Sequence, residues 1–111
     1  MRLSAQLRPS GINKEPIKIA ILDTGYDEQS DFFLLPERGR HMKGWEDFAC
    51  NSSGPEDSDG HGTHVTALAL KMAPFADIYV ARVAKDTNEL QNSGENIAKA
   101  CYPQRIYFIV M

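Results

Sequence analysis

Apolar residues fall into short runs along the chain, separated by polar and glycine-rich segments. The clearest runs are IKIAIL (17–22), DIYVARV (77–83) and RIYFIVM (105–111). Runs of this length with little polar alternation are typical of strands that are covered on both faces, as in a parallel sheet. A weaker candidate strand, KGWEDF (43–48), lies within an otherwise irregular stretch. The pattern therefore predicts a sheet with three main strands.

Two segments between these strands have the spacing of helices. Residues 61–73 carry apolar side chains nearly all round, which predicts a helix buried on every side. Residues 92–100 predict a second helix, in which Asn92 and Glu95 have the spacing of a capping box. Strand, helix, strand, helix, strand is the order of an α/β fold with a parallel sheet.

The length and composition are those of one ordinary domain. The chain has 111 residues, 42% of them hydrophobic, and a net charge of −3 that gives no reason to expect a nucleic-acid partner. We expect a polar lead-in at residues 1–16 and a domain over 17–111. Cys50 and Cys101 lie in unrelated contexts, which favours reduced thiols over a disulfide.

No segment resembles a targeting or membrane sequence. The N-terminal residues lack the apolar run of a signal peptide, and no stretch approaches the ~20 apolar residues of a membrane span. No membrane partner is expected, and a cytoplasmic location is the default expectation.

The stretch DGHGTHVTAL (59–68) places two histidines at the start of the first predicted helix. A calcium loop is one explanation, with Asp57, Asp59 and Gly62 at its first, third and sixth positions. However, position five is His61, and position twelve is Leu68 where a bidentate glutamate is required. The pattern therefore disfavours a calcium loop.

A zinc site is a second explanation. His61 and His64 could reach one metal ion from a single helical turn, but the chain has no paired cysteines and no HExxH motif, and His41 stands alone. His64, one turn into a buried helix, is expected to satisfy a backbone carbonyl. His61 lies at the helix mouth, where the helix dipole disfavours a positive charge and helps to keep the ring neutral.

A catalytic base is the third explanation, and it requires an acid that fixes the tautomer of the imidazole. Asp23 ends the first apolar strand, and α/β sheets build their sites at the carboxyl ends of strands. Alone, an aspartate there is more often a turn or cap residue. Paired with His61, it is expected within hydrogen-bonding reach, about 2.6–3.2 Å.

These residues also carry a family resemblance. AILDTGYD (20–27) and DGHGTHVTALAL (59–70) resemble the aspartate and histidine blocks of the subtilisin-like serine proteases, in that family's order. The similarity continues through APFADIYVARV (73–83) and SGENIAKA (93–100), and so covers roughly residues 17–100. One departure is VTAL (65–68), where the family usually has Val-Ala-Gly, a change expected to affect close packing rather than chemistry.

The resemblance implies a truncated, doubly wound parallel sheet and the hydrolysis of peptide bonds in protein or peptide substrates. It implies that Asp23 is the orienting acid and His61 the general base, that Thr63 and His64 have no direct chemical role, and that Asp57 shapes the loop. It implies no organic cofactor. Calcium is common in the family, and Asp31 is the only candidate ligand, without an assigned site.

The family's third block, a serine in a Gly-Thr-Ser context, has no counterpart in these residues, and neither has the oxyanion asparagine. The 111 residues alone are therefore expected to be inactive. CYPQR (101–105) breaks the second helix early, which suggests a truncated gene, an altered splice or a shifted reading frame near position 101. A deletion that leaves RIYFIVM as a substitute strand explains it equally. In either case residues 17–111 are expected to be a truncated N-terminal part of the peptidase domain. The alternatives are a non-catalytic remnant that acts as a binding module, or a gene fragment without function. Self-association is expected, because a sheet cut off partway exposes apolar surface and strand edges.

Overall fold

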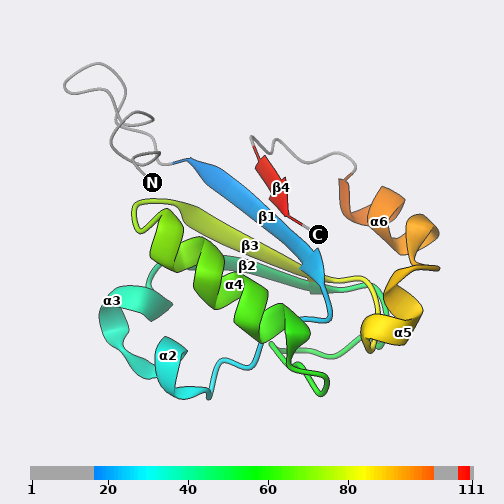
Figure 1. Cartoon of the computed structure of the whole chain (residues 1–111), viewed down its shortest axis with the longest axis horizontal. Coiled ribbons are helices and arrows are strands. Elements are labelled where there is room, and N and C mark those ends of the chain that lie inside the picture. The colour runs from blue at the N-terminus through cyan, green and yellow to red at the C-terminus, as the bar shows by residue number, and fades with distance from the viewer. Residues whose placement is uncertain (1–16, 102–107, 111) are drawn as a thin grey trace.

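A single four-stranded parallel sheet forms the centre of the structure, which is a computed structural model that describes residues 17–101 and 108–110. The strand order is β2-β3-β1-β4. The strands are β1 (Lys18–Asp23), β2 (Met42–Asp47), β3 (Asp77–Arg82) and β4 (Phe108–Val110). All three predicted strands and the weaker candidate at 43–48 are present (Figure 1).

The central position of β1 follows from its pairing on both edges. On one side Lys18 lies opposite Asp77 and Asp23 opposite Arg82, and on the other Ile19 lies opposite Phe108. Because all pairs are parallel, the strands end at the same edge of the sheet. Asp23 therefore lies at the carboxyl edge, where α/β proteins place their sites.

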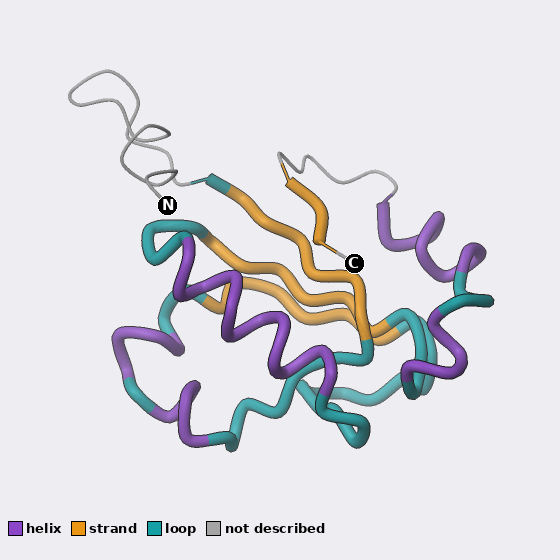
Figure 2. Tube along the Cα trace, viewed as in Figure 1, coloured by secondary structure: helices purple, strands orange, loops and turns teal. Residues whose placement is uncertain are grey.

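Helices cover both faces of the sheet (Figures 1 and 2). The helical segments are α2 (Asp31–Leu34), α3 (Pro36–Gly39), α4 (His61–Met72), α5 (Thr87–Leu90) and α6 (Gly94–Cys101). Leu70 of α4 packs with Ile19 and Ile21, whereas Ala100 of α6 packs with Ala20 and Leu22. Alternate residues of β1 thus enter two different cores, and the predicted doubly wound α/β fold is confirmed.

Two local predictions differ from the structure. α6 begins at Gly94, so Ser93 rather than Asn92 precedes the helix, and no hydrogen bond between Asn92 and Glu95 occurs in the described part of the chain. The side-chain cap belongs instead to α5, where Asp86 accepts a 2.9 Å hydrogen bond from the backbone N–H of Glu89. The helix propensity of this region is thus divided between two short helices.

The helix α4 is buried on one side only. Gly62, Thr66 and Leu70 are its buried residues, while Leu68 and Met72 are 43% and 49% exposed. The prediction of a helix buried all round is therefore wrong for these residues. Its sequence is apolar on a face that nothing in the described chain covers.

No helix among the described residues is long and apolar enough to cross a membrane. Cys50 is an exposed free thiol. The predicted lead-in at 1–16 and the side chain of Cys101 lie outside the described residues.

Candidate active site

Asp23 is fully buried at the end of β1 and points toward the start of α4. Its side chain is 0% exposed, and its Oδ1 accepts a 2.7 Å hydrogen bond from the backbone N–H of Thr24. The same oxygen lies 2.8 Å from Nδ1 of His61. Oδ2 is buried and has no hydrogen-bond partner among the described residues. One carboxylate oxygen therefore orients the histidine.

His61 is the first residue of α4 and follows Gly60, whose φ of 99° lies in the left-handed region. Because a carboxylate oxygen only accepts hydrogen bonds, the contact with Asp23 places the ring hydrogen on Nδ1. The other nitrogen, Nε2, then carries the lone pair in the neutral ring. With 44% of its side chain exposed, His61 is accessible to a reacting molecule.

The pKa of His61 is raised from its ordinary value. The main cause is the hydrogen bond that the His61 ring donates to Asp23, with further contributions from the negative charges of Asp23, Asp59 and Asp57, and partial burial opposes them. The expectation that the helix dipole keeps this ring neutral therefore has the wrong direction. The nearby carboxylates favour the charged ring, and they make Nε2 a better proton acceptor.

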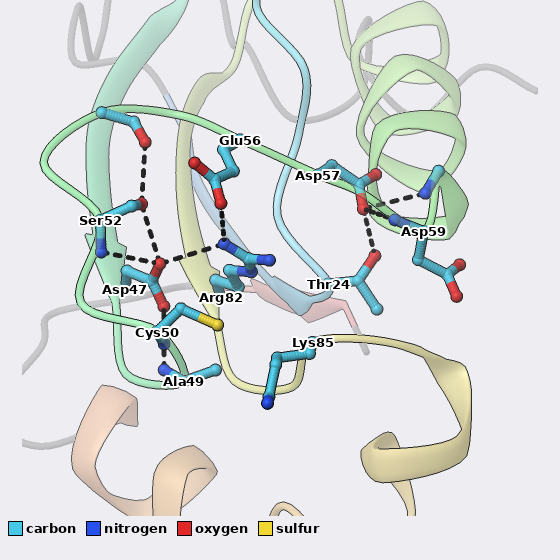
Figure 3. Close-up of polar contacts among 12 residues, drawn as sticks. Thr24, Asp47, Ala49, Cys50, Ser52, Glu56, Asp57, Asp59, Arg82 and Lys85 are labelled. Atoms are coloured by element: carbon cyan, nitrogen blue, oxygen red, sulfur yellow. Dashed lines mark hydrogen bonds and ion pairs between the residues drawn. The ribbon is translucent and has the colours of Figure 1, made fainter.

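The Asp57 carboxylate joins the two segments that carry Asp23 and His61 (Figure 3). Oδ1 accepts from the hydroxyl of Thr24 at 2.8 Å and from the backbone N–H of Gly60 at 2.9 Å. Oδ2 accepts from the backbone N–H of Thr63 at 2.8 Å and from its hydroxyl at 2.6 Å. Burial raises the pKa of Asp57, but these hydrogen bonds outweigh it, so the net pKa is lowered.

Two glycines allow α4 to approach the end of β1 closely. A Cβ atom on Gly62 would overlap the backbone of Gly25, and one on Gly25 would overlap the carbonyl oxygen of Glu56. Gly25 also has φ +105°, which side chains rarely adopt. The backbone N–H of Gly62 donates a 2.9 Å hydrogen bond to Oγ1 of Thr24. The short Asp23–His61 distance depends on this contact between backbones.

A buried cation anchors the irregular segment that leads into this site. Arg82 is 2% exposed, and its Nη1 lies 2.8 Å from Glu56 Oε1 and 3.3 Å from Asp47 Oδ2 (Figure 3). Asp47 also accepts hydrogen bonds from the backbone N–H groups of Ala49, Cys50 and Ser52. The sequence analysis missed this cluster, although an arginine within an apolar strand is a signal that a buried acid must lie nearby.

The same network sets the pKa of Asp47. Burial raises it, but the hydrogen bonds from Cys50, Ser52 and Ala49 outweigh burial and lower the pKa to about 2. Asp47 is therefore ionised at neutral pH and satisfies both Arg82 and the turn that follows β2.

Asp59, His64 and Asp31, which were also considered for a metal site, either accept hydrogen bonds from the backbone or are exposed. The Asp59 carboxylate accepts hydrogen bonds from the backbone N–H groups of His61 and Thr87, and so faces donors rather than a cation. His64 is exposed instead of bonding a backbone carbonyl as expected. Asp31 is exposed at the start of α2. Within 17–101 and 108–110, no three histidine, cysteine or acidic side chains are placed to share a metal ion.

A buried aspartate that contacts a histidine at the carboxyl edge of a parallel sheet is an arrangement that acid–base catalysis can use. Residues 14–111 match the Subtilase family, and the chain belongs to that family. It is 39% identical over 87 residues to thermitase of Thermoactinomyces vulgaris, which covers 69% of this chain and 27% of the relative.

Two other relatives match a similar share of the chain. Subtilisin BL of Lederbergia lenta is 28% identical over 82 residues, which is 66% of this chain and 28% of the relative. Subtilisin-like protease het-Q2 of Podospora anserina is 28% identical over 109 residues, which is 67% of this chain and 30% of the relative. The chain thus spans less than a third of the length of these relatives. No solved structure shows a significant match.

Proposed function

We propose that residues 17–111 form the N-terminal part of a subtilisin-like serine endopeptidase domain and supply the acid–base half of its catalytic site. In this proposal His61 is the general base and Asp23 the residue that orients it, and the substrates are peptide bonds of proteins or peptides. The 2.8 Å contact between Asp23 Oδ1 and His61 Nδ1 is the observation that carries the proposal.

The chemistry follows from the protonation of the ring. Nε2 of His61 removes the proton from a serine hydroxyl as its oxygen attacks the peptide carbonyl carbon, and then donates that proton to the leaving amine. Water enters and repeats the cycle on the acyl-enzyme, which restores the serine. Asp23 stays ionised throughout and stabilises the imidazolium. No organic cofactor is needed, because every step is a proton transfer coupled to acyl transfer.

The serine must come from outside these 111 residues. None of the seven serines in the sequence lies in a Gly-Thr-Ser context, and no described serine hydroxyl makes a hydrogen bond with His61. In subtilisin, removal of the nucleophile lowers turnover on the order of 10⁶-fold. The 111 residues by themselves are accordingly proposed to be inactive.

The second candidate is a non-catalytic remnant that binds a partner. The two candidate functions predict different activities for the product of the complete gene. If that product contains a Gly-Thr-Ser serine, we expect it to hydrolyse casein and to be labelled by a fluorophosphonate probe, and His61→Ala to abolish both. The 111-residue chain should show neither. Labelling of the 111-residue chain that disappears in His61→Ala would contradict the proposed inactivity, and a complete product without turnover or labelling would favour the binding module.

A further inference from the structure

A groove of about 620 Å³ lies at the amino-terminal edge of the sheet, away from Asp23 and His61. Its walls come from the α2–α3 segment, the last turn of α4 and the residues before β3. Figure 1 shows α3 and this end of α4 on the side of the molecule opposite the loops that follow β1 and β3. The volume is within the range of about 300–1,000 Å³ that is typical of ligand pockets.

Three basic side chains line this groove: Arg38, Arg40 and Lys71. In the described part of the chain none of them forms an ion pair, and Glu37 is the only acidic side chain in the lining. The groove is therefore locally positive on a chain whose net charge is −3. Such a local field attracts an anion at short range, whereas the overall charge does not favour a polyanion.

Two of the basic side chains lie beside the aromatic ring of Phe32. The guanidinium of Arg38 lies 4.1 Å from the centre of the Phe32 ring, and its Nη1 donates a 3.4 Å hydrogen bond to the Phe32 carbonyl. Lys71 Nζ lies 5.4 Å from the same ring. These contacts hold two positive charges beside an aromatic face.

Apart from His41, the rest of the lining is apolar. Leu70 of the lining belongs to the buried core, while Phe75 of the lining is 49% exposed. An apolar side chain seated between them would remove further area of Phe75 from water, worth about 25 cal/mol per Å². A simple inorganic anion would leave this surface uncovered.

We propose that the groove binds an acidic peptide segment, with a carboxylate at Arg40 and Lys71 and a neighbouring aliphatic or aromatic side chain against Phe32 and Phe75. A ligand that fits this groove must carry a negative charge for the basic side chains and an apolar group for the aromatic ones. An aspartate or glutamate next to a leucine or phenylalanine supplies both. Lys71 lies ten residues along α4 from His61, or about 15 Å at 1.5 Å per residue. Binding here leaves His61 accessible, and the inference does not depend on whether the chain cleaves peptides.

Fluorescence anisotropy with labelled peptides tests this inference on the 111-residue chain. The probe is a short peptide with the sequence Glu-Leu-Asp-Phe and blocked ends, and its control is Gln-Leu-Asn-Phe. We expect the acidic peptide to bind about tenfold or more tightly than the neutral one, and to lose most of this preference between about 50 and 500 mM NaCl. Equal affinity for the two peptides would overturn the proposal.

The affinities of three variants of the protein test whether the peptide binds in this groove. The double variant Arg40→Glu, Lys71→Glu should lower the affinity for the acidic peptide by about tenfold or more, because it reverses two charges that face the ligand. Phe75→Ser should lower the affinity for both peptides, since it removes the contact between the Phe75 ring and the apolar side chain of the peptide. Lys99→Glu reverses an exposed charge on α6, outside the groove, and is the matched control that should change affinity less than twofold.

Two further results would contradict the proposal. One is an equal loss of affinity in Lys99→Glu and in the groove variant, which would indicate attraction to the whole surface. The other is competition by inorganic phosphate or by anionic lipid vesicles as strong as competition by the unlabelled acidic peptide. If the groove variant does not fold, the comparison of the acidic and neutral peptides on the unchanged chain still decides the proposal.

Discussion

The hydroxyl of Thr24 donates a 2.8 Å hydrogen bond to Oδ1 of Asp57, across 33 residues of sequence. Thr24 follows the buried acid of the site, and Asp57 also binds the first turn of the helix that carries its histidine. One carboxylate thus fixes the end of a strand to the start of a helix. The geometry of the candidate site therefore depends on a residue that touches neither Asp23 nor His61.

Replacement of Asp57 tests this role. Asp57→Ala removes the acceptors for Thr24, Gly60 and Thr63, and should lower the free energy of unfolding by about 2 kcal/mol. Asp57→Asn keeps one acceptor oxygen and should cost less. Urea unfolding gives the measurement, with the exposed neighbour Ser58→Ala as the control. Equal stability of Asp57→Ala and Ser58→Ala would contradict the assignment.

The raised pKa of His61 can be tested by titrating its ring in the unchanged chain and in two variants. Its imidazole should titrate above about 6.5, the ordinary histidine value. Asp23→Asn should lower the His61 pKa more than Asp59→Asn does, because the hydrogen bond that the ring donates to Asp23 is the main cause of the shift. The charged form is favoured on folding. The stabilisation it brings is thus complete below the unfolded pKa and is lost as pH rises through the folded value.

NMR of the imidazole carbons and nitrogens follows this titration without any need for activity. Glu95→Gln on α6 is the control, since Glu95 is not among the groups that shift His61. A His61 pKa at or below the ordinary value in the unchanged chain would show that the Asp23 contact does not form in solution.

The low pKa of Asp47 predicts a loss of stability in acid. Its folded pKa of about 2 lies below the unfolded value, so its stabilisation is present above about pH 4 and is lost as pH falls toward 2. The lowering of the Asp47 pKa by nearly two units corresponds to about 2 kcal/mol in the free energy of unfolding, because this carboxylate is buried. Unfolding by urea at several pH values should show this slope, and Asp47→Asn should flatten it while lowering stability at pH 7. An unchanged slope in Asp47→Asn would assign the acid sensitivity to other groups.

The contact between α4 and the end of β1 predicts opposite results for two glycines. Gly62→Ala places a Cβ against the backbone of Gly25 and should cost about 1–3 kcal/mol, as overpacking usually does. Gly94→Ala has no heavy atom within 4 Å of its new Cβ and should be neutral or stabilising by about 0.5 kcal/mol. Thermal melts of the two variants give the comparison. If Gly62→Ala melts at the temperature of the unchanged chain, α4 lies farther from β1 than described.

The exposed apolar side of α4 predicts self-association of the 111-residue chain. Leu68 and Met72 present large side chains to solvent on this helix. We expect a mass above that of a monomer in size-exclusion chromatography with light scattering, increasing with concentration. Leu68→Glu combined with Met72→Lys should raise the monomer fraction. A sharp monomer peak with a cooperative melt above about 50 °C, in the usual range of mesophilic domains, would contradict this expectation.

The sequence predicted the strands and the α/β class because apolar runs of fixed length report burial on both faces directly. It also predicted that Asp23 and His61 would lie together, since parallel strands and the helices between them meet at one edge of the sheet. It failed on the exposed side of α4. Hydrophobicity reports what a helix can bury, and it does not report what covers the helix in these 111 residues.

The polar network around the site could not be read from spacing. Arg82, Asp47 and Glu56 come together only when β2 and β3 pair, and Asp59 reaches Thr87 across 28 residues. The short helices α2, α3 and α5 lie in segments with too few residues to show a period. Such contacts follow from the fold, so only an arginine within an apolar strand could have signalled them.

The position of β1 in the centre of the sheet has a consequence for the order in which the chain folds. Lys18 pairs across from Asp77, and Ile19 across from Phe108, which are separations of 59 and 89 residues along the chain. At a synthesis rate of about 5–20 residues per second, β1 leaves the ribosome roughly 4–18 s before β4 does. During that interval β1, whose residues are almost all buried in the finished fold, has at least one unpaired edge. Such long-range pairing slows folding and exposes the nascent chain to aggregation, so chaperones that hold apolar segments should increase the yield of folded protein.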